Sequence, residues 1–202
     1  MFALFTTIFV SAIYVGVTTF HSEMVPSDLL LAIAATREKV PFPVLFEILI
    51  MEAAFELIRE AGLRVPNPMG PTIGIVGALI LGQAAVEANI ISPIVIIVVA
   101  LSGLSSFAVS DISLNFAIRI IRFLFIFAAG MFGIFGMTAL FVTGLYYLVS
   151  LKSFGVPYLA PMSPHYVSSG DTVFRRALTH ESFRPGYLKP DDLKKKGDGA
   201  VK

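Results

Sequence analysis

The sequence predicts an all-α protein, an integral membrane helical bundle with about four full spans plus interfacial or re-entrant helices. Two observations carry this prediction. Hydrophobic residues make up 56% of the 202 residues and charged residues only 14%, whereas soluble domains usually contain about 45–50% apolar and about 25% charged residues. Apolar runs also recur at lengths near the roughly 20 residues that cross a bilayer. A soluble globular enzyme is therefore excluded as the leading interpretation.

The apolar runs define the predicted helices in chain order. Residues 1–20 carry no charge and predict the first span. The segment 29–36 is apolar but too short to cross a bilayer. Residues 44–61 predict an amphipathic helix, which lies at the interface or forms a re-entrant hairpin with 29–36. The other full spans are expected at 70–91, 93–110 and 123–151, with an interfacial helix over 111–122.

Charge divides the chain into two predicted domains. Residues 1–151 have a net charge of −3 and residues 152–202 a net charge of +4. We expect a transmembrane helical domain over 1–151 and a polar, basic, partly disordered tail over 152–202. The basic tail predicts a cytosolic C-terminus. The uncharged start lacks the basic region of a signal peptide, so we expect that residues upstream of it are missing.

The residue types also indicate whether the chain could hold a catalytic site, a metal or a cofactor. The chain contains no cysteine and only three histidines, which lie far apart in the sequence. It carries none of the short motifs of metalloproteases, α/β-hydrolases or P-loop nucleotide-binding proteins. We therefore expect no catalytic residue, no metal site and no cofactor, and we do not expect an enzyme.

The candidate functional residues lie on the predicted helix 70–91. Small residues at every fourth position permit close helix approach, either within the chain or at a subunit interface. This small-residue row comprises Gly70, Gly74, Ala78 and Gly82. A second face is apolar and ends in a carboxylate, which suits a hydrophobic gate with a cation-attracting ring; the alternative is a carboxylate at headgroup level with no role in conduction. These pore-lining candidates are Ile73, Gly77, Ile80, Ala84 and Glu87.

Two carboxylates of the predicted helix 44–61 share one face. Glu52 and Glu56 stand four residues apart, and Arg59 follows Glu56 by three. One interpretation is an ordinary solvated helix face. The other is an acidic vestibule, formed by Glu52 and Glu56, that concentrates cations.

Three strings together resemble the membrane domain of the GerA family, the A subunits of spore germinant receptors in endospore-forming bacteria. They are VPFPVLFEILIMEAAFELIREAGLRVPNPMGPTIGIVGALILGQAAVEANIISPIVIIVVA (40–100), RIIRF (119–123) and SFGVPYLAPMSP (153–164). The resemblance covers residues 1–164. The tail string FRPGYLKPDDLKKK (183–196) is most similar to the stage V sporulation protein AF type within this family.

The resemblance implies a function. Family members are expected in the spore inner membrane, as oligomeric rings proposed to be pentamers, and they release monovalent cations during germination. It further implies other spore germination membrane proteins as partners, a cytosolic domain before the first span, and a pore lined by the helix matching 71–90. The residues themselves leave two alternatives open: a secondary transporter with broken helices, and a non-conducting scaffold that docks partner proteins. No nucleic-acid partner is expected.

Overall fold

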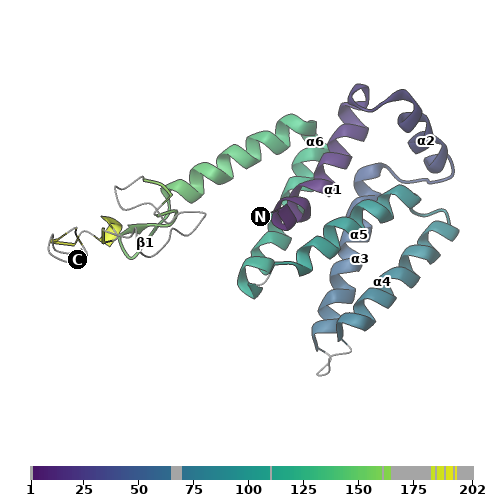
Figure 1. Ribbon diagram of the computed structural model, residues 1–202. Helices are drawn as coiled ribbons and strands as arrows, with labels where there is room; N and C mark the ends of the chain where they lie inside the picture. The colour runs from purple at the N-terminus through teal and green to yellow at the C-terminus, as the bar shows by residue number, and fades with distance from the viewer. Residues whose placement is uncertain are drawn as a thin grey trace, which may run out of the picture. The chain divides into compact units, whose positions relative to one another are not determined.

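The structure is a computed structural model that describes residues 2–64, 70–109, 111–160, 162–164, 183–184, 186–188, 190–192 and 194. Residues 1–140 and 141–202 form two compact units, each considered by itself. The helices are α1 (Phe2–Phe20), α2 (Ser27–Arg37), α3 (Val44–Arg64), α4 (Gly70–Glu87), α5 (Pro93–Phe107) and α6 (Ile112–Ser150), with the short 3₁₀ helices η1 (Ser22–Met24) and η3 (Gly186–Leu188) (Figure 1).

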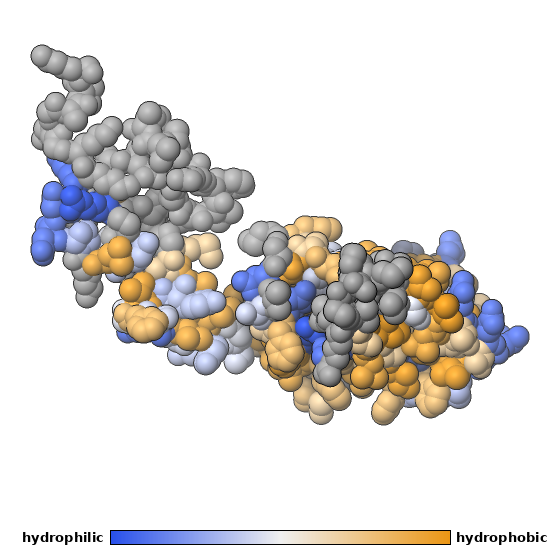
Figure 2. Space-filling view, turned by 90° about the horizontal axis from the view of Figure 1, so that it is seen from below, coloured by the Kyte–Doolittle hydropathy of each residue, from blue (hydrophilic) through white to orange (hydrophobic). Residues whose placement is uncertain are grey.

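The all-α class is confirmed. The described residues contain two named strands, and each is only two residues long: β1 (Lys152–Ser153) and β2 (Val156–Pro157). Two helices are long and apolar enough to cross a membrane, Phe2–Phe20 and Ser113–Ser150. Figure 2 shows hydrophobic residues over much of the visible surface of the 1–140 unit, as expected for a surface that faces lipid. The chain is therefore a helical membrane bundle.

Helices α4 and α5 are shorter than the predicted segments 70–91 and 93–110. Helices α4 and α5 contain 18 and 15 residues. At 1.5 Å per residue, 15 residues reach only about 22 Å, less than the roughly 30 Å of a bilayer's hydrocarbon core. By length and apolar composition together, the described residues contain two candidate spans, Phe2–Phe20 and Ser113–Ser150, and α4 and α5 form a helical hairpin.

The hairpin turn has a local cause in the sequence. Asn89 follows α4 with a φ of +55°, a conformation that asparagine tolerates better than most residues. The amide of Ile90 donates to the carbonyl of Ala85 (3.0 Å) and that of Asn89 to Val86 (2.9 Å), which is the Schellman pattern of a helix end. Pro93 then occupies the first turn of α5, where its missing N–H costs nothing.

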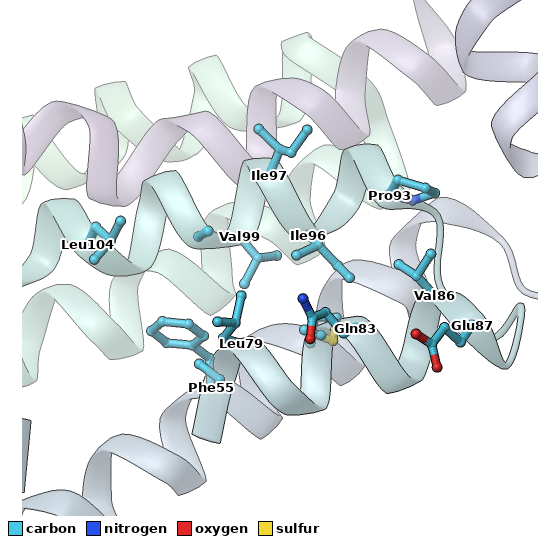
Figure 3. A pocket seen from close by; sticks show the side chains of 14 residues that line it. Phe55, Leu79, Gln83, Val86, Glu87, Pro93, Ile96, Ile97, Val99 and Leu104 are labelled. Atoms are coloured by element: carbon cyan, nitrogen blue, oxygen red, sulfur yellow. The ribbon is translucent and has the colours of Figure 1, made fainter. Parts of the chain in front are cut away.

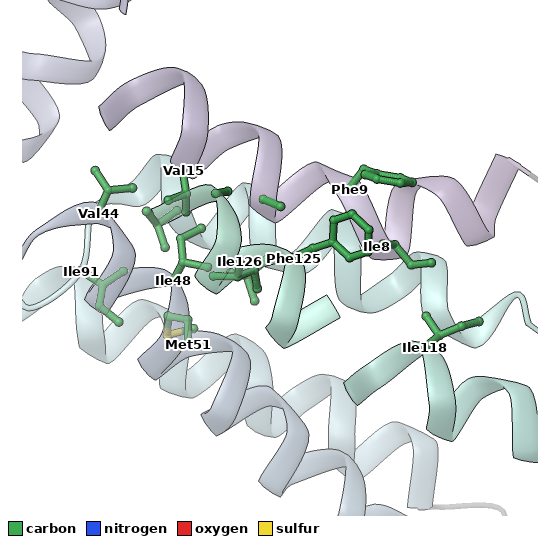
Figure 4. Close-up of a cluster of buried hydrophobic side chains, with 14 residues drawn as sticks. Ile8, Phe9, Val15, Val44, Ile48, Met51, Ile91, Ile118, Phe125 and Ile126 are labelled. Atoms are coloured by element: carbon green, nitrogen blue, oxygen red, sulfur yellow. The ribbon is translucent and has the colours of Figure 1, made fainter. Parts of the chain in front are cut away.

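The hydrophobic core of the 1–140 unit lies between α1, α3, α5 and α6 (Figure 4). Apolar residues three and four apart place one stripe of each helix on this centre. The buried core residues are Ile8, Phe9, Ala12, Val15, Val44, Ile48, Met51, Ile91, Val95, Val99, Ile118, Phe125, Ile126 and Ala129. In the described part of α4, no residue belongs to this buried set, so α4 is attached to the core from outside.

Helix α6 replaces two predicted elements. The segments 111–122 and 123–151 were expected as an interfacial helix and a separate span, but the helix continues without a break across 122–123 within Ile112–Ser150. It is interrupted at Gly133, where φ is +63° and ψ is −148°. A Cβ at Gly133 would lie 2.8 Å from Cε1 of His21 and 3.0 Å from Cβ of Phe20. The break therefore packs against the end of α1 at a position that only glycine fits.

Two smaller differences concern helix ends and the tail. Helix α3 continues through Gly62 to Arg64 instead of ending at 61, because a glycine lowers helix propensity by only about 1 kcal/mol. Most of the predicted tail, 152–202, lies outside the described residues. The proposed division of the chain at 151 stays a prediction.

The break in α6 gives the first test. We expect Gly133→Ala to lower the free energy of unfolding by about 1–3 kcal/mol, because the backbone conformation is open almost only to glycine and because the new Cβ meets His21. Gly144→Ala is the matched control, since a Cβ there meets no described heavy atom within 4 Å. Thermal unfolding in detergent measures both. Equal melting temperatures for the two variants would contradict the proposed role of Gly133.

Candidate functional site

Helix α4 carries most of the candidate residues and lies on the outside of the bundle, packed against α3. Of the pore-lining candidates, Ile80 is 61% exposed, and Ala84 and Glu87 are exposed as well. Gly77 is different, because a Cβ there would touch Cγ2 of Ile58 on α3 at 3.4 Å. The side chain of Ile73 lies outside the described residues. The structure thus places Ile80, Ala84 and Glu87 at exposed positions and directs Gly77 towards α3.

Only part of the small-residue row packs against another helix of the same chain among the described residues. A Cβ on Gly82 would touch Cγ2 of Ile96 on α5 at 3.4 Å, so close packing there is intramolecular. A Cβ on Gly74 meets no described heavy atom within 4 Å. Ala78 lies between these two and lines a pocket. Gly70 begins α4, but its surroundings lie outside the described residues.

This pocket has a volume of about 600 Å³ and lies between α3, α4 and α5 (Figure 3). Its walls are almost wholly apolar. The polar exceptions are Gln83 and Glu87, both on α4. Phe55 of α3 and Leu79 of α4 lie next to each other in the close-up (Figure 3). The hollow therefore adjoins the row of small residues and contains the carboxylate that ends the exposed face of α4.

A buried charge network that the sequence did not reveal lies at the centre of the bundle. Arg122 of α6 and Glu52 of α3 are both fully buried, with Nη2 and Oε2 3.1 Å apart. Ser11 of α1 donates a hydrogen bond to Oε1 of Glu52 (2.7 Å). Arg122 donates through Nη1 to Oγ of Ser102 on α5 (3.1 Å). A single ion pair with two serines thus connects all four core helices.

The network continues towards the surface through Glu56, which is 22% exposed. Glu56 pairs with Arg119, and its Oε2 lies 3.5 Å from Nη2 of Arg122 and 3.7 Å from Nη1 of Arg59. Arg59 in turn donates to the carbonyl oxygen of Gly103 on α5 (3.0 Å). These hydrogen bonds and ion pairs fix α3 against α5 and α6.

The predicted acidic vestibule of Glu52 and Glu56 is wrong. A carboxylate concentrates cations only when it faces water and is not already paired. Glu52 has no exposed surface. Glu56 faces three guanidinium groups, so the recorded ion pairs set two carboxylates against three positive charges. The alternative of a solvated helix face fails for Glu52 for the same reason.

A second buried carboxylate, Glu47, joins the loops at the opposite end of α3. Its Oε1 lies 3.1 Å from Nη2 of Arg37, the last residue of α2. Its Oε2 accepts a hydrogen bond from the backbone amide of Ser92, the residue before α5 (2.9 Å). A negative charge at a helix N-terminus is favoured by the helix dipole. Glu47 therefore holds the α4–α5 turn against α3.

One sequence signal could have found the central network. Glu52 and Glu56 are four residues apart on α3, and Arg119 and Arg122 are three apart on α6, so each pair occupies one helix face. Ionisable groups inside a membrane bundle usually pair with each other. Complementary pairs on two apolar helices indicate such a pairing. The serines gave no signal, because a serine in an apolar helix is equally compatible with a bond to its own backbone.

The Bacillus/Clostridium GerA spore germination protein family matches residues 1–187. The chain belongs to this family. It is 44% identical to spore germination protein KA of Bacillus subtilis (strain 168) over 96% of the chain and 36% of that protein. It is 45% identical to spore germination protein A1 of the same strain over 79% of the chain and 33% of that protein.

A third relative is spore germination protein GerLA of Bacillus cereus, 39% identical over 90% of the chain and 37% of that protein. This member of the GerA family spans about a third of the length of these curated relatives. No solved structure matches it. The similarity of the tail to the stage V sporulation protein AF type stays a prediction.

The central ion pair gives the second test. We expect Arg122→Met to lower the free energy of unfolding by about 3–5 kcal/mol, because Glu52 is left buried and uncompensated. The double variant Glu52→Gln/Arg122→Met removes both charges and should recover much of this loss. Unfolding in detergent measures the three proteins. Arg119→Met, which removes a more exposed partner, is the matched control and should cost less; equal losses for Arg122→Met and Arg119→Met would contradict the central role of Arg122.

Proposed function

We propose that this chain is a membrane subunit of a spore germination complex and that several copies form an oligomeric channel for monovalent cations. The channel acts in germination signalling or amplifies it. The observation that carries the proposal is the exposed apolar face of α4, Ile80 and Ala84, which ends at the exposed carboxylate of Glu87. The chain belongs to a family of spore germination proteins, which supports the process in which this face would act.

The physical argument concerns a ring of α4 helices. Water avoids a narrow apolar passage, so Ile80 side chains facing one another would exclude hydrated ions in the closed state. Carboxylates of Glu87 at the end of the same face would attract cations and repel anions. The row Gly74, Ala78 and Gly82 would let neighbouring helices approach closely. A ring of identical chains, proposed to be a pentamer, combines these three properties.

The location and partners belong to the same proposal. The apolar bundle places the chain in a membrane, which we propose is the spore inner membrane, and the basic tail favours a cytosolic C-terminus. Other spore germination membrane proteins are the proposed partners. The names of the relatives, spore germination proteins KA and A1, support this setting.

The break in α6 at Gly133 favours a second candidate function, a secondary transporter. Interrupted helices expose backbone groups that bind ions, and transporters use them at the substrate site. The two functions differ in kinetics. Purified protein in a planar bilayer should show discrete single-channel current steps if it is a channel. Flux that saturates and is coupled to a second solute, with no current steps, would support the transporter. The absence of flux would leave a scaffold.

The gate gives the third test. We expect Ile80→Ser to produce a cation leak without stimulus, because a hydroxyl wets the narrow passage. Ile97→Ser is the matched control, since Ile97 on α5 is similarly exposed, 66% against 61% for Ile80. Potassium efflux from vesicles, normalised to the amount of inserted protein, measures both. A leak that is equal in the two variants, or missing from Ile80→Ser at normal protein level, ends the gate assignment.

The carboxylate gives the fourth test. Glu87→Gln should lower cation conductance, and Glu87→Lys should lower it further or shift the selectivity towards anions, because the ring loses or reverses its charge. Glu23→Gln changes an exposed carboxylate outside α4 and should leave conductance unchanged. Reversal potentials in asymmetric potassium chloride report selectivity. Parental conductance and selectivity in both Glu87 variants would place Glu87 outside the ion path.

A further inference from the structure

A small hairpin follows α6 almost directly. Strand β1 pairs antiparallel with β2, with Lys152 opposite Pro157 and Ser153 opposite Val156. The amide of Tyr158 donates to the carbonyl of Leu151 (2.9 Å), which closes the base of the hairpin. The two-residue turn between the strands is Phe154–Gly155, and both residues have positive φ, +51° and +80°. Two positive φ values are what a type I′ hairpin turn requires.

Phe154 is an unusual residue at this position. The first position of a type I′ turn prefers Asn, Asp or Gly, because a bulky side chain is strained at positive φ. Phenylalanine is tolerated there when its ring gains contacts that offset the strain. The ring of Phe154 is fully exposed, so the described residues give it no such contacts. Strained positions of this kind often mark functional sites, and an exposed aromatic ring at such a position is available for a contact outside the described residues.

The position of the hairpin in the sequence indicates which environment surrounds the ring of Phe154. Residues 123–151 contain no charge, and Lys152 is the first charged residue after Arg122. The span candidate Ser113–Ser150 ends two residues before Lys152. Where a long uncharged run ends, the chain leaves the hydrocarbon core and enters the headgroup layer. The hairpin therefore begins at the depth of a membrane surface.

The neighbouring side chains match that layer. Tyr146 and Tyr147 in the last two turns of α6 and Tyr158 after the hairpin are 76%, 64% and 60% exposed. Tyrosine rings concentrate at membrane–water interfaces, where one end is apolar and the other meets water. The exposed ammonium of Lys152 is complementary to anionic lipid headgroups.

We propose that the β1–β2 hairpin is a membrane-interface anchor. The ring of Phe154 inserts below the headgroups of the bilayer, the three tyrosines lie at headgroup level, and Lys152 contacts lipid phosphates. The occupant of this aromatic surface is lipid, not another protein. The anchor fixes the depth at which α6 ends, and it does not depend on whether the chain conducts ions.

The chain contains no tryptophan, so Phe154→Trp introduces a single tryptophan at the tip, which can be excited selectively over the tyrosines. The full chain is reconstituted in vesicles of phosphatidylcholine and phosphatidylglycerol, with acyl chains brominated either near the headgroup or near the bilayer centre. We expect emission at shorter wavelength than that of N-acetyltryptophanamide, and stronger quenching by the shallow bromines. Emission as in water without quenching overturns the anchor. Short-wavelength emission that neither lipid quenches also overturns it, because the ring is then packed on protein.

A second pair of variants separates the ring from the rest of the hairpin. The chain also has no cysteine, so Ser153→Cys carries one spin label beside the tip. Phe154→Asn is added in the second protein, because asparagine suits positive φ and preserves the turn. We expect the label to lose oxygen accessibility and gain accessibility to a water-soluble nickel reagent when Phe154 is replaced. An unchanged depth would show that the ring is not the anchor.

Discussion

Arg122 and Glu52 form a fully buried ion pair that also engages Ser11 and Ser102, and so it contacts each of the four helices around the hydrophobic core. Apolar side chains alone specify such a bundle weakly, because in lipid one apolar face can replace another at little cost. A buried charge pair is different, since a shift of one helix by one turn would leave a charge without its partner. The relative register of α1, α3, α5 and α6 therefore depends on this pair, and the core packs around it.

Helix α4 is held to the bundle by other contacts than the central ion pair. None of its described residues belongs to the buried core, against which its half-buried Ala85 packs. Its position follows from packing on α3 and from the turn that Glu47 holds through the amide of Ser92. A helix attached in this way keeps an apolar face free, which is what a lumen or a subunit contact needs. In the proposed channel, the fixed centre and the outer helix would divide structural and functional roles between different segments.

The sequence predicted those features that depend on local pattern. Hydropathy located each helix of the 1–140 unit, and the alternation of small and apolar residues on α4 located its candidate faces. It failed where the outcome depends on a distant partner. Glu52 looked solvated because nothing near it in the sequence shows that Arg122 will lie beside it. Gly133 resembled any glycine of an apolar helix, because its backbone conformation depends on the end of α1. The end of α4 was placed too late because apolar residues of the connecting turn, Ile90 and Ile91, extend the hydrophobic run. The end of α5 was placed too late because Ala108 and Val109 extend it in the same way.

The chain order of the central pair has a consequence for biosynthesis. Glu52 is translated long before Arg122, and a carboxylate without a counter-charge is expensive to place in hydrocarbon. Helix α3 therefore has to stay in contact with water or with the insertion machinery until α6 has been made. Only then can Glu52 and Glu56 meet Arg119 and Arg122. The buried pair can therefore form only after Arg122 has been made, and the burial of Glu52 depends on a helix that is translated later.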